Sequence, residues 1–193
     1  MPSRTPSKNH AATEVADLIL QLSRAAYADC ARHGLTQAQW IAMRFFSRAN
    51  RFSRTVSGFA EYHATTRGTA SQTVSSLVDK GYLARRPSPR DGRSVEFELT
   101  PAARGMLGVD PLERIVRAAD RLSVTQQSRT VAGLRAVLDE FETERDCVPA
   151  IGPCRLCGHL GTDAETGSRC RLMRESLDKD ELDELCVRFN APA

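Results

Sequence analysis

The stretch that decides the fold is GTASQTVSSLVDKGYLARRPSPRDGRSVEFEL, residues 68–99. Residues 68–80 carry apolar side chains at helical spacing, and Gly81 follows, so they predict a helix that ends at this glycine. Residues 82–86 predict a short strand, and residues 95–99 alternate apolar and polar side chains, the period of a half-buried strand. The prolines and the Asp-Gly pair between these strands are typical of a turn. A helix, a glycine and a basic hairpin therefore follow one another.

Three helices are predicted before this stretch. Residues 11–33 carry one apolar stripe, formed by Val15, Leu18, Ile19 and Leu22, and Gly34 ends the helix. Thr36 is predicted to cap a second helix over residues 37–49. A shorter third helix covers about residues 56–63.

Helices resume after the hairpin, with Thr100 as the N-cap and Pro101 as the first helical residue. They run over residues 102–121, with an interruption near Gly108 or Pro111. Ser123 is predicted to cap a long helix with a continuous apolar face. That face is formed by Val131, Leu134, Val137, Leu138 and Phe141.

The first and the last long helix have apolar faces that a domain of this size does not bury alone, which predicts a homodimer. The predicted fold class is mainly α with a small β-hairpin wing (α+β), a winged helix-turn-helix with a helical dimerisation region. Residues 1–10 are expected to be a disordered arm, 11–34 a dimerisation helix, 35–100 the DNA-binding domain, 101–146 dimerisation helices and 147–193 a cysteine-rich metal- or cluster-binding appendage.

Charge is concentrated in the middle of the chain. The formal net charge is only +3, but residues 44–93 hold ten basic and three acidic residues, a local net charge of +7. Residues 171–193 hold four basic and six acidic residues, a local net charge of −2. A basic middle in a nearly neutral chain indicates a surface that binds a polyanion, although a solvated arginine-rich face would give the same count.

The helix over residues 68–80 has the side chains of a DNA-reading helix. The major groove of B-DNA admits one α-helix, and its N-terminal side chains reach the base edges. Gln72 can bond adenine with two hydrogen bonds, Arg67 can contact a phosphate, and arginines on the hairpin suit phosphates or an AT-rich minor groove. The alternative is a polar face exposed to solvent. The candidate DNA-binding residues are Arg67, Thr69, Ser71, Gln72, Thr73, Ser75, Ser76, Arg86, Arg90 and Arg93.

These segments resemble the MarR family of transcriptional regulators over about residues 11–141. The resemblance rests on residues 35–40 (LTQAQW), 69–83 (TASQTVSSLVDKGYL), 86–93 (RPSPRDGR) and 99–100 (LT). It implies an obligate homodimer joined by the terminal helices, with two recognition helices that read a pseudo-palindrome. It also implies that Asp91 orients the wing and that Arg93 enters the minor groove. Gly92 and Gln72 stand where many members have arginine, so the operator sequence cannot be transferred to this chain.

The appendage holds a second candidate site. Cys154 and Cys157 are separated by two residues and followed by Gly158, a spacing at which two thiolates can bind one metal and nearby N–H groups can turn toward sulfur. With Cys147 and Cys170 they form the predicted ligand set, and Cys186 and His159 are spare candidates. An iron–sulfur cluster is the favoured cofactor because only one such pair is present; zinc, a metal-free redox dithiol and incidental cysteines are the alternatives.

Cys186 is expected on the apolar stripe of a last helix over residues 176–189, where packing explains it better than metal binding. Cys30 is expected in the core. Because the appendage follows the dimerisation helix, cluster loss or oxidation there could change the spacing of the recognition helices.

The expected function is a sequence-specific DNA-binding regulator, acting as a repressor, whose C-terminal cysteines sense redox or metal state. The alternative is an ordinary MarR-type repressor that responds to a small phenolic ligand and has a structural zinc site. We expect no enzyme, because the Cys154–Cys157 pair lacks a thioredoxin-like context and no phosphate loop or Ser/His/Asp arrangement is present. No stretch is apolar enough for a membrane span or a secretory signal, which predicts a cytoplasmic protein.

Overall fold

The computed structural model describes residues 8–28, 30–88, 94–143, 151–163 and 167–191. Its helices are α1 (Lys8–Tyr27), α2 (Gln37–Arg48), α3 (Val56–Tyr62), α4 (Arg67–Asp79), α5 (Pro101–Leu107), α6 (Glu113–Ala119) and α7 (Val124–Thr143). Its strands are β1 (Leu83–Pro87), β2 (Val95–Leu99), β3 (Gly152–Pro153), β4 (Leu160–Asp163), β5 (Gly167–Cys170), β6 (Glu175–Leu177) and β7 (Leu185–Cys186). Short 3₁₀ helices cover Cys30–His33, Cys154–Leu156 and Asp180–Asp183.

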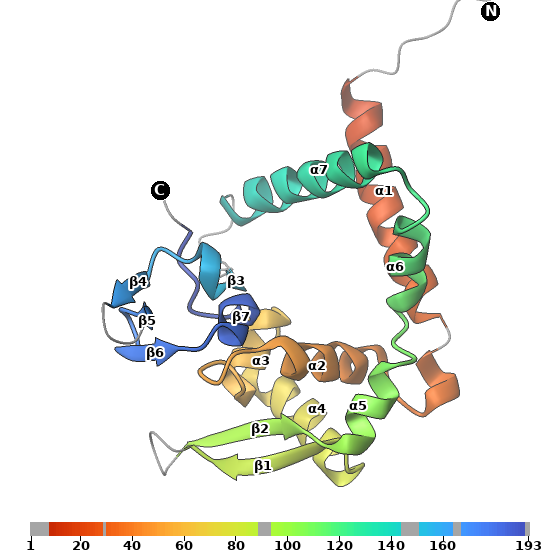
Figure 1. The fold of residues 1–193 in the computed structure, drawn as a ribbon. Helices are drawn as coiled ribbons and strands as arrows, with labels where there is room; N and C mark the ends of the chain where they lie inside the picture. Colours follow the sequence, from red (N-terminus) through yellow and green to blue (C-terminus); the bar gives the residue numbers. More distant parts are fainter. Residues whose placement is uncertain (1–7, 29, 89–93, 144–150, 164–166, 192–193) are drawn as a thin grey trace, which may run out of the picture.

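The winged core consists of α2, α3, α4 and the antiparallel hairpin β1–β2, which we call the wing (Figure 1). Its register pairs Leu83 with Leu99, and these two side chains are buried in the core together with Phe97. Aromatic rings join the parts: Phe45 packs on Phe59 of α3, and Phe46 packs on Phe97 of the wing. The predicted mainly helical winged fold is confirmed.

Threonine side chains fix where the helices begin. Thr36 accepts a hydrogen bond from the backbone N–H of Gln39, whose side chain bonds back to the backbone of Thr36, a complete capping box. Thr55, Thr66 and Thr100 cap α3, α4 and α5. Each cap stabilises its helix by about 1 kcal/mol. The caps predicted at Thr36 and Thr100 are confirmed.

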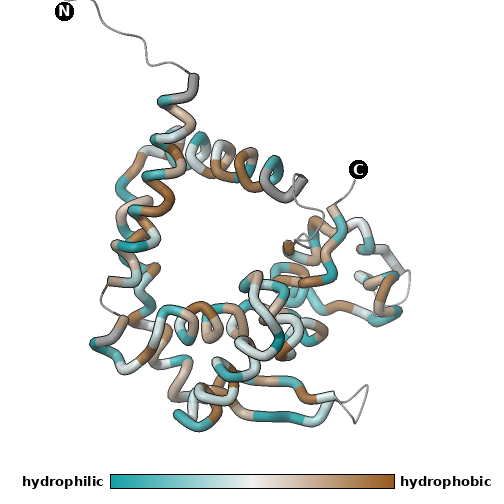
Figure 2. The backbone as a smooth tube through the Cα atoms, turned by 180° about the vertical axis from the view of Figure 1, so that it is seen from behind, coloured by the Kyte–Doolittle hydropathy of each residue, from teal (hydrophilic) through white to brown (hydrophobic). Residues whose placement is uncertain are grey.

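Helices α1, α6 and α7 extend away from the winged core (Figure 1). The break between α5 and α6 lies at the predicted place, where Asp110 accepts hydrogen bonds from the backbone N–H of Leu112 and from Arg44 of α2. Large apolar side chains of α1 and α7 are 40–79% exposed, among them Leu18 and Leu134. Hydrophobic segments recur along both helices (Figure 2). Among the described residues, no helix is both long enough and apolar enough to cross a membrane.

Two predictions at the N-terminal end are wrong. Helix α1 begins at Lys8, inside the expected arm, and ends at Tyr27; Cys30–His33 forms a separate 3₁₀ helix. Gly34 adopts a φ of +67°, which suits the glycine expected to end the segment. Cys30 is buried in the core, as expected.

Residues 151–163 and 167–191, called the C-terminal unit here, form two small antiparallel sheets. β3 pairs with β7, and β4, β5 and β6 form a second sheet. The helix predicted over residues 176–189 is wrong: this segment holds β6, a 3₁₀ helix and β7. Leu185 also forms a parallel bridge with Ala49, so partners distant in sequence take the backbone bonds that a helix would use internally.

The connection between α2 and α3, residues 49–55, is called the α2–α3 turn. It lies between the winged core and the C-terminal unit (Figure 1). A Cβ atom at Gly58 of α3 would stand 2.2 Å from the carbonyl oxygen of Ser53, closer than atoms can approach. Glycine is required here because the turn packs directly on the backbone of α3.

We therefore predict that Gly58→Ala destabilises the protein by about 1–3 kcal/mol, the usual cost of overpacking. Gly105→Ala is the matched control: no atom lies within 4 Å of its added Cβ, and it should be neutral or stabilise by up to about 1 kcal/mol. Urea unfolding followed by circular dichroism measures both. Equal stabilities of the two variants would contradict the packing described.

Candidate DNA-binding surface and cysteine cavity

Helix α4 divides into an inner and an outer face. Ala70, Val74 and Leu77 are buried in the core. The outer face begins at the N-terminus of the helix, where Arg67, Thr69, Ser71 and Gln72 are exposed. Thr66 caps the helix and also shares a hydroxyl–hydroxyl hydrogen bond of 3.0 Å with Thr69. The first turn of α4 therefore presents hydrogen-bonding side chains on a rigid backbone.

The remaining predicted DNA-binding residues of α4 are half-buried and less accessible than those of the first turn. Ser76 accepts a hydrogen bond of 2.9 Å from Nε2 of Gln39 on α2, and Lys80 donates to Oε1 of the same glutamine. Thr73 donates its hydroxyl to the carbonyl of Thr69, and Ser75 is half-buried. Ser76 thus ties α4 to α2, a role that its sequence position alone did not indicate.

The wing lies beside α4. Arg86 is exposed and pairs with Glu98 across the hairpin at 3.2 Å. A groove of about 570 Å³ separates the wing from α3 and the start of α4, and Arg67 and Ser94 line it, together with Arg188 of the C-terminal unit. The predicted wing-tip residues Arg90 and Arg93, and Asp91 between them, lie outside the described residues.

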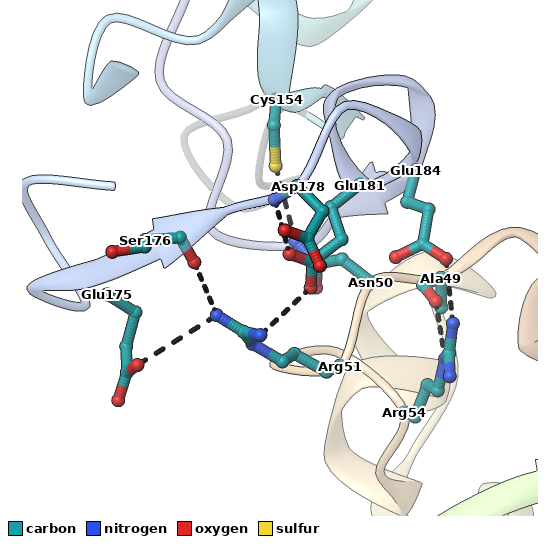
Figure 3. A network of polar contacts seen from close by, with 10 residues as sticks. All are labelled: Ala49, Asn50, Arg51, Arg54, Cys154, Glu175, Ser176, Asp178, Glu181 and Glu184. Carbon is teal, nitrogen blue, oxygen red and sulfur yellow. Dashed lines mark hydrogen bonds and ion pairs between the residues drawn. The ribbon is translucent and has the colours of Figure 1, made fainter. Parts of the chain in front are cut away.

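Part of the basic middle segment binds acidic residues of the chain itself (Figure 3). Arg51 pairs with Glu181 at 3.3 Å and donates to the carbonyl of Ser176 at 2.6 Å. Arg54 pairs with Glu184 at 2.8 Å, and its Nε donates to the carbonyl of Ala49. Burial raises the pKa of Glu184, and the neighbouring guanidinium of Arg54 opposes that shift. These arginines dock the C-terminal unit, so the count of +7 overstates the charge presented to a polyanion.

Asn50 lies at the centre of the α2–α3 turn and is completely buried. Its backbone N–H donates to the carbonyl of Leu185 at 2.8 Å, its Oδ1 accepts from the hydroxyl of Ser53 at 2.7 Å, and its Nδ2 donates to Sγ of Cys154 at 3.5 Å. The hydroxyl of Ser53 also accepts from the backbone N–H of Val187. Sequence analysis did not identify this contact, because no local pattern links residues about a hundred positions apart.

Four cysteines, Cys154, Cys157, Cys170 and Cys186, line one small cavity of about 10 Å³ inside the C-terminal unit, next to Asn50. We call it the cysteine cavity. The predicted ligand Cys147 lies outside the described residues. Cys186, expected to be a packing residue on a helix, is instead the last residue of β7 and lines the cavity with the other three cysteines.

The four thiols are free cysteines, and none is in a disulfide. Cys154 and Cys186 share a hydrogen bond, which together with burial raises the pKa of Cys154. The same hydrogen bond lowers the pKa of Cys186 to about 5, although burial of that thiol opposes the shift. Within the described ranges, no three His, Cys, Asp or Glu side chains are already arranged around one point as metal ligands.

Known structures and families agree with this fold. The model of the MarR family matches residues 33–94. A MarR/EmrR family transcriptional regulator from Acinetobacter sp. ADP1 superposes with a TM-score of 0.56 at 17% identity, over 72% of this chain and 99% of that chain. Staphylococcus aureus MepR in a DNA complex gives 0.55 at 14% identity, over 70% and 96%, and BldR from Sulfolobus solfataricus gives 0.53 at 17%, over 70% and 99%. No curated protein sequence matches the chain.

The fold and the α4–wing surface define a winged helix-turn-helix protein. Residues 33–94, which hold α2 to β1 and end just before the second wing strand, are the segment that the MarR family model matches. The C-terminal unit lies outside the segment that the family model matches.

We predict that Arg54→Ala loosens the C-terminal unit and costs about 1–3 kcal/mol, because it removes two hydrogen bonds of a charged donor and leaves Glu184 half-buried without its partner. Hydrogen exchange followed by mass spectrometry should show faster exchange at residues 185–188. Arg48→Ala, at the exposed end of α2, is the control and should change stability by less than about 0.5 kcal/mol. Unchanged protection in Arg54→Ala would disprove the docking role.

Proposed function

We propose that this protein is a sequence-specific DNA-binding transcriptional regulator that acts as a homodimeric repressor. The observation that carries the proposal is the exposed first turn of α4, with Arg67, Thr69, Ser71 and Gln72 beside the wing groove. A helix that presents short hydrogen-bonding side chains at its N-terminus suits the major groove, and the adjacent hairpin suits the phosphate backbone.

Two further features support DNA binding at the surface formed by α4 and the wing. Arg67 and Arg188 line the groove between α4 and the wing, so cations face the place where a DNA strand would pass. The similar fold of MepR has been seen in a complex with DNA, which supports the same use of α4 here. A regulator of this kind acts where the chromosome lies, in line with the predicted cytoplasmic location.

DNA binding is tested with duplexes selected from a random library by the protein itself. Gln72→Ala should weaken binding to the selected duplex by about 1–3 kcal/mol and relax the choice of one base, because a bidentate base contact is lost. Arg67→Ala should weaken binding to all sequences alike and lower the salt slope by about 1. Fluorescence anisotropy at several salt concentrations measures both.

Arg129→Ala on α7 is the charge-matched control and should bind DNA as the unchanged protein does. The proposal fails if no duplex is enriched at moderate salt, or if Gln72→Ala and Arg67→Ala bind as tightly as the control.

The dimer is the second part of the proposal. Val15, Leu18, Ile19 and Leu22 form one stripe on α1, and they are 40–52% exposed in the single chain. Four residues of the predicted α7 face, Val131, Leu134, Val137 and Leu138, are 46–54% exposed. Two unpartnered apolar faces on helices that stand away from the winged core indicate burial against a second copy.

We predict that Leu134→Glu converts the dimer to a monomer, since a charge in an apolar interface is strongly unfavourable. Sedimentation velocity at micromolar concentration measures the change. Arg129→Glu is the control, because it introduces a glutamate on the face of α7 opposite to the apolar residues. Arg129 lies about two and a half helical turns before Leu138, so the two side chains point in opposite directions, and this variant should leave the dimer intact. A monomeric unchanged protein would refute the dimer.

We further propose that the controlling signal enters through the C-terminal unit, since Asn50 and Arg54 connect that unit to the α2–α3 turn. The predicted role of the cysteines in sensing redox or metal state is part of this proposal, and the iron–sulfur cluster remains a prediction. The small-ligand alternative is favoured by one observation, a cavity of about 270 Å³ between the end of α1 and α6, lined by Arg32, Arg114 and Arg117.

A further inference from the structure

We propose that Cys154, Cys157, Cys170 and Cys186 form a four-thiolate site for a single tetrahedral metal ion, zinc by its chemistry, and that this ion fixes the α2–α3 turn of the winged core. The proposal does not depend on DNA binding. It replaces Cys147 with Cys186 in the expected ligand set.

The fold brings the four cysteines together from separate elements. Cys154 begins a 3₁₀ helix, Cys157 follows it, Cys170 ends β5 and Cys186 ends β7. All four line the cysteine cavity, although Cys186 lies 32 positions beyond Cys154 in the sequence. Two small sheets that position four thiols around one cavity are typical of structural zinc modules, in which the metal supplies the folding free energy that a small core lacks.

Backbone and side-chain N–H groups point at three of the four sulfur atoms. Nδ2 of Asn50 donates to Cys154 at 3.5 Å, the N–H of Asn190 donates to Cys157 at 3.4 Å, and the N–H of Arg188 donates to Cys186 at 3.4 Å. Donors of this kind stabilise the negative charge of metal-bound thiolates and orient them. A thiol that only fills a core needs no such donors.

The size of the cavity selects the occupant. A volume of about 10 Å³ is near the roughly 10–15 Å³ that one water molecule needs, so it suits one ion. An iron–sulfur cluster contains several iron and sulfide atoms and would have to displace the surrounding side chains, among them Phe52 and Leu177. Thiolates prefer soft or borderline metals, and zinc is the common tetrahedral one.

The ligands would have to close around the ion. With Zn–S bonds of about 2.3 Å, a tetrahedron places its sulfur atoms about 3.8 Å apart. Cys154 and Cys186 are already within hydrogen-bonding reach of each other, whereas Cys157 and Cys170 are half-buried at the cavity wall. Rotation about their Cα–Cβ bonds would have to bring the sulfur atoms of Cys157 and Cys170 to this distance. Each thiol that binds loses its proton to solvent, and Zn²⁺ with four thiolates carries a charge of −2 beside the N–H donors and Arg188.

The bond from Asn50 to Cys154 gives the site its effect on the rest of the protein. Asn50 is fully buried in the α2–α3 turn, and its side chain joins one ligand to Ser53. Ser53 in turn contacts the backbone of α3 at Gly58. Binding of the ion would therefore order the turn that leads into α3 and α4.

The test begins with the full chain purified without chelators. Elemental analysis should find one zinc ion per chain, and X-ray absorption at the zinc edge should show four sulfur atoms at about 2.3 Å and no nitrogen. After exchange of zinc for Co²⁺, strong sulfur-to-cobalt charge-transfer bands should appear. These measurements use the unchanged protein, so they remain decisive if a variant fails to fold.

Cys186→Ser and Cys170→Ser should lose the ion, whereas the matched controls Cys147→Ser and His159→Ala should retain one ion per chain. Metal loss in Cys147→Ser with retention in Cys186→Ser would overturn the ligand set. Stoichiometric iron and sulfide after anaerobic purification would overturn the single ion in favour of a cluster. A chain that binds neither zinc nor Co²⁺ through sulfur would overturn the site, whatever its affinity for DNA.

Discussion

The buried side chain of Asn50 is the constraint on which the arrangement of the molecule depends. A buried amide without partners costs about 1–3 kcal/mol, and the partners of Asn50 come from both sides: Ser53 in its own turn and Cys154 and Leu185 in the C-terminal unit. The α2–α3 turn is thus satisfied only when the C-terminal unit is in place. The partners that complete this turn come from more than a hundred residues further along the chain.

Ion pairs also connect the winged core to the C-terminal unit. Arg51 and Arg54 belong to the basic middle segment, yet they pair with Glu181 and Glu184 of the C-terminal unit (Figure 3). Pairs of this kind are partly shielded from solvent and orient the unit more than they stabilise it. The acidic character of residues 171–193 is therefore complementary to the winged core, and Arg67, the basic residue of α4, is not among the arginines that these acids bind.

The features that could be predicted from the sequence are those that depend on residues close together in the chain. Caps such as Thr36, the glycine after α4 and the alternation in residues 95–99 act within a few residues, so the winged core could be predicted nearly to its bounds. The C-terminal unit could not, because Leu185 and Cys186 pair with Ala49 and β3, and such distant partners override a short helical stripe. For the same reason sequence analysis predicted that Cys186 packs on a helix and that Ser76 lies on the outer face of α4.

The position of the C-terminal unit also determines how a signal would reach the proposed DNA-binding surface on α4. In sequence the unit follows α7, which suggests a route through α7 and α1. In space it contacts the α2–α3 turn, and Ser53 of that turn meets α3 so closely that a Cβ at Gly58 has no room. A contact without free space transmits displacement, because packed atoms cannot be compressed. A shift of Asn50 and Ser53 therefore moves α3, and α3 packs along α4. The shorter route from the cysteines to α4 passes through this turn.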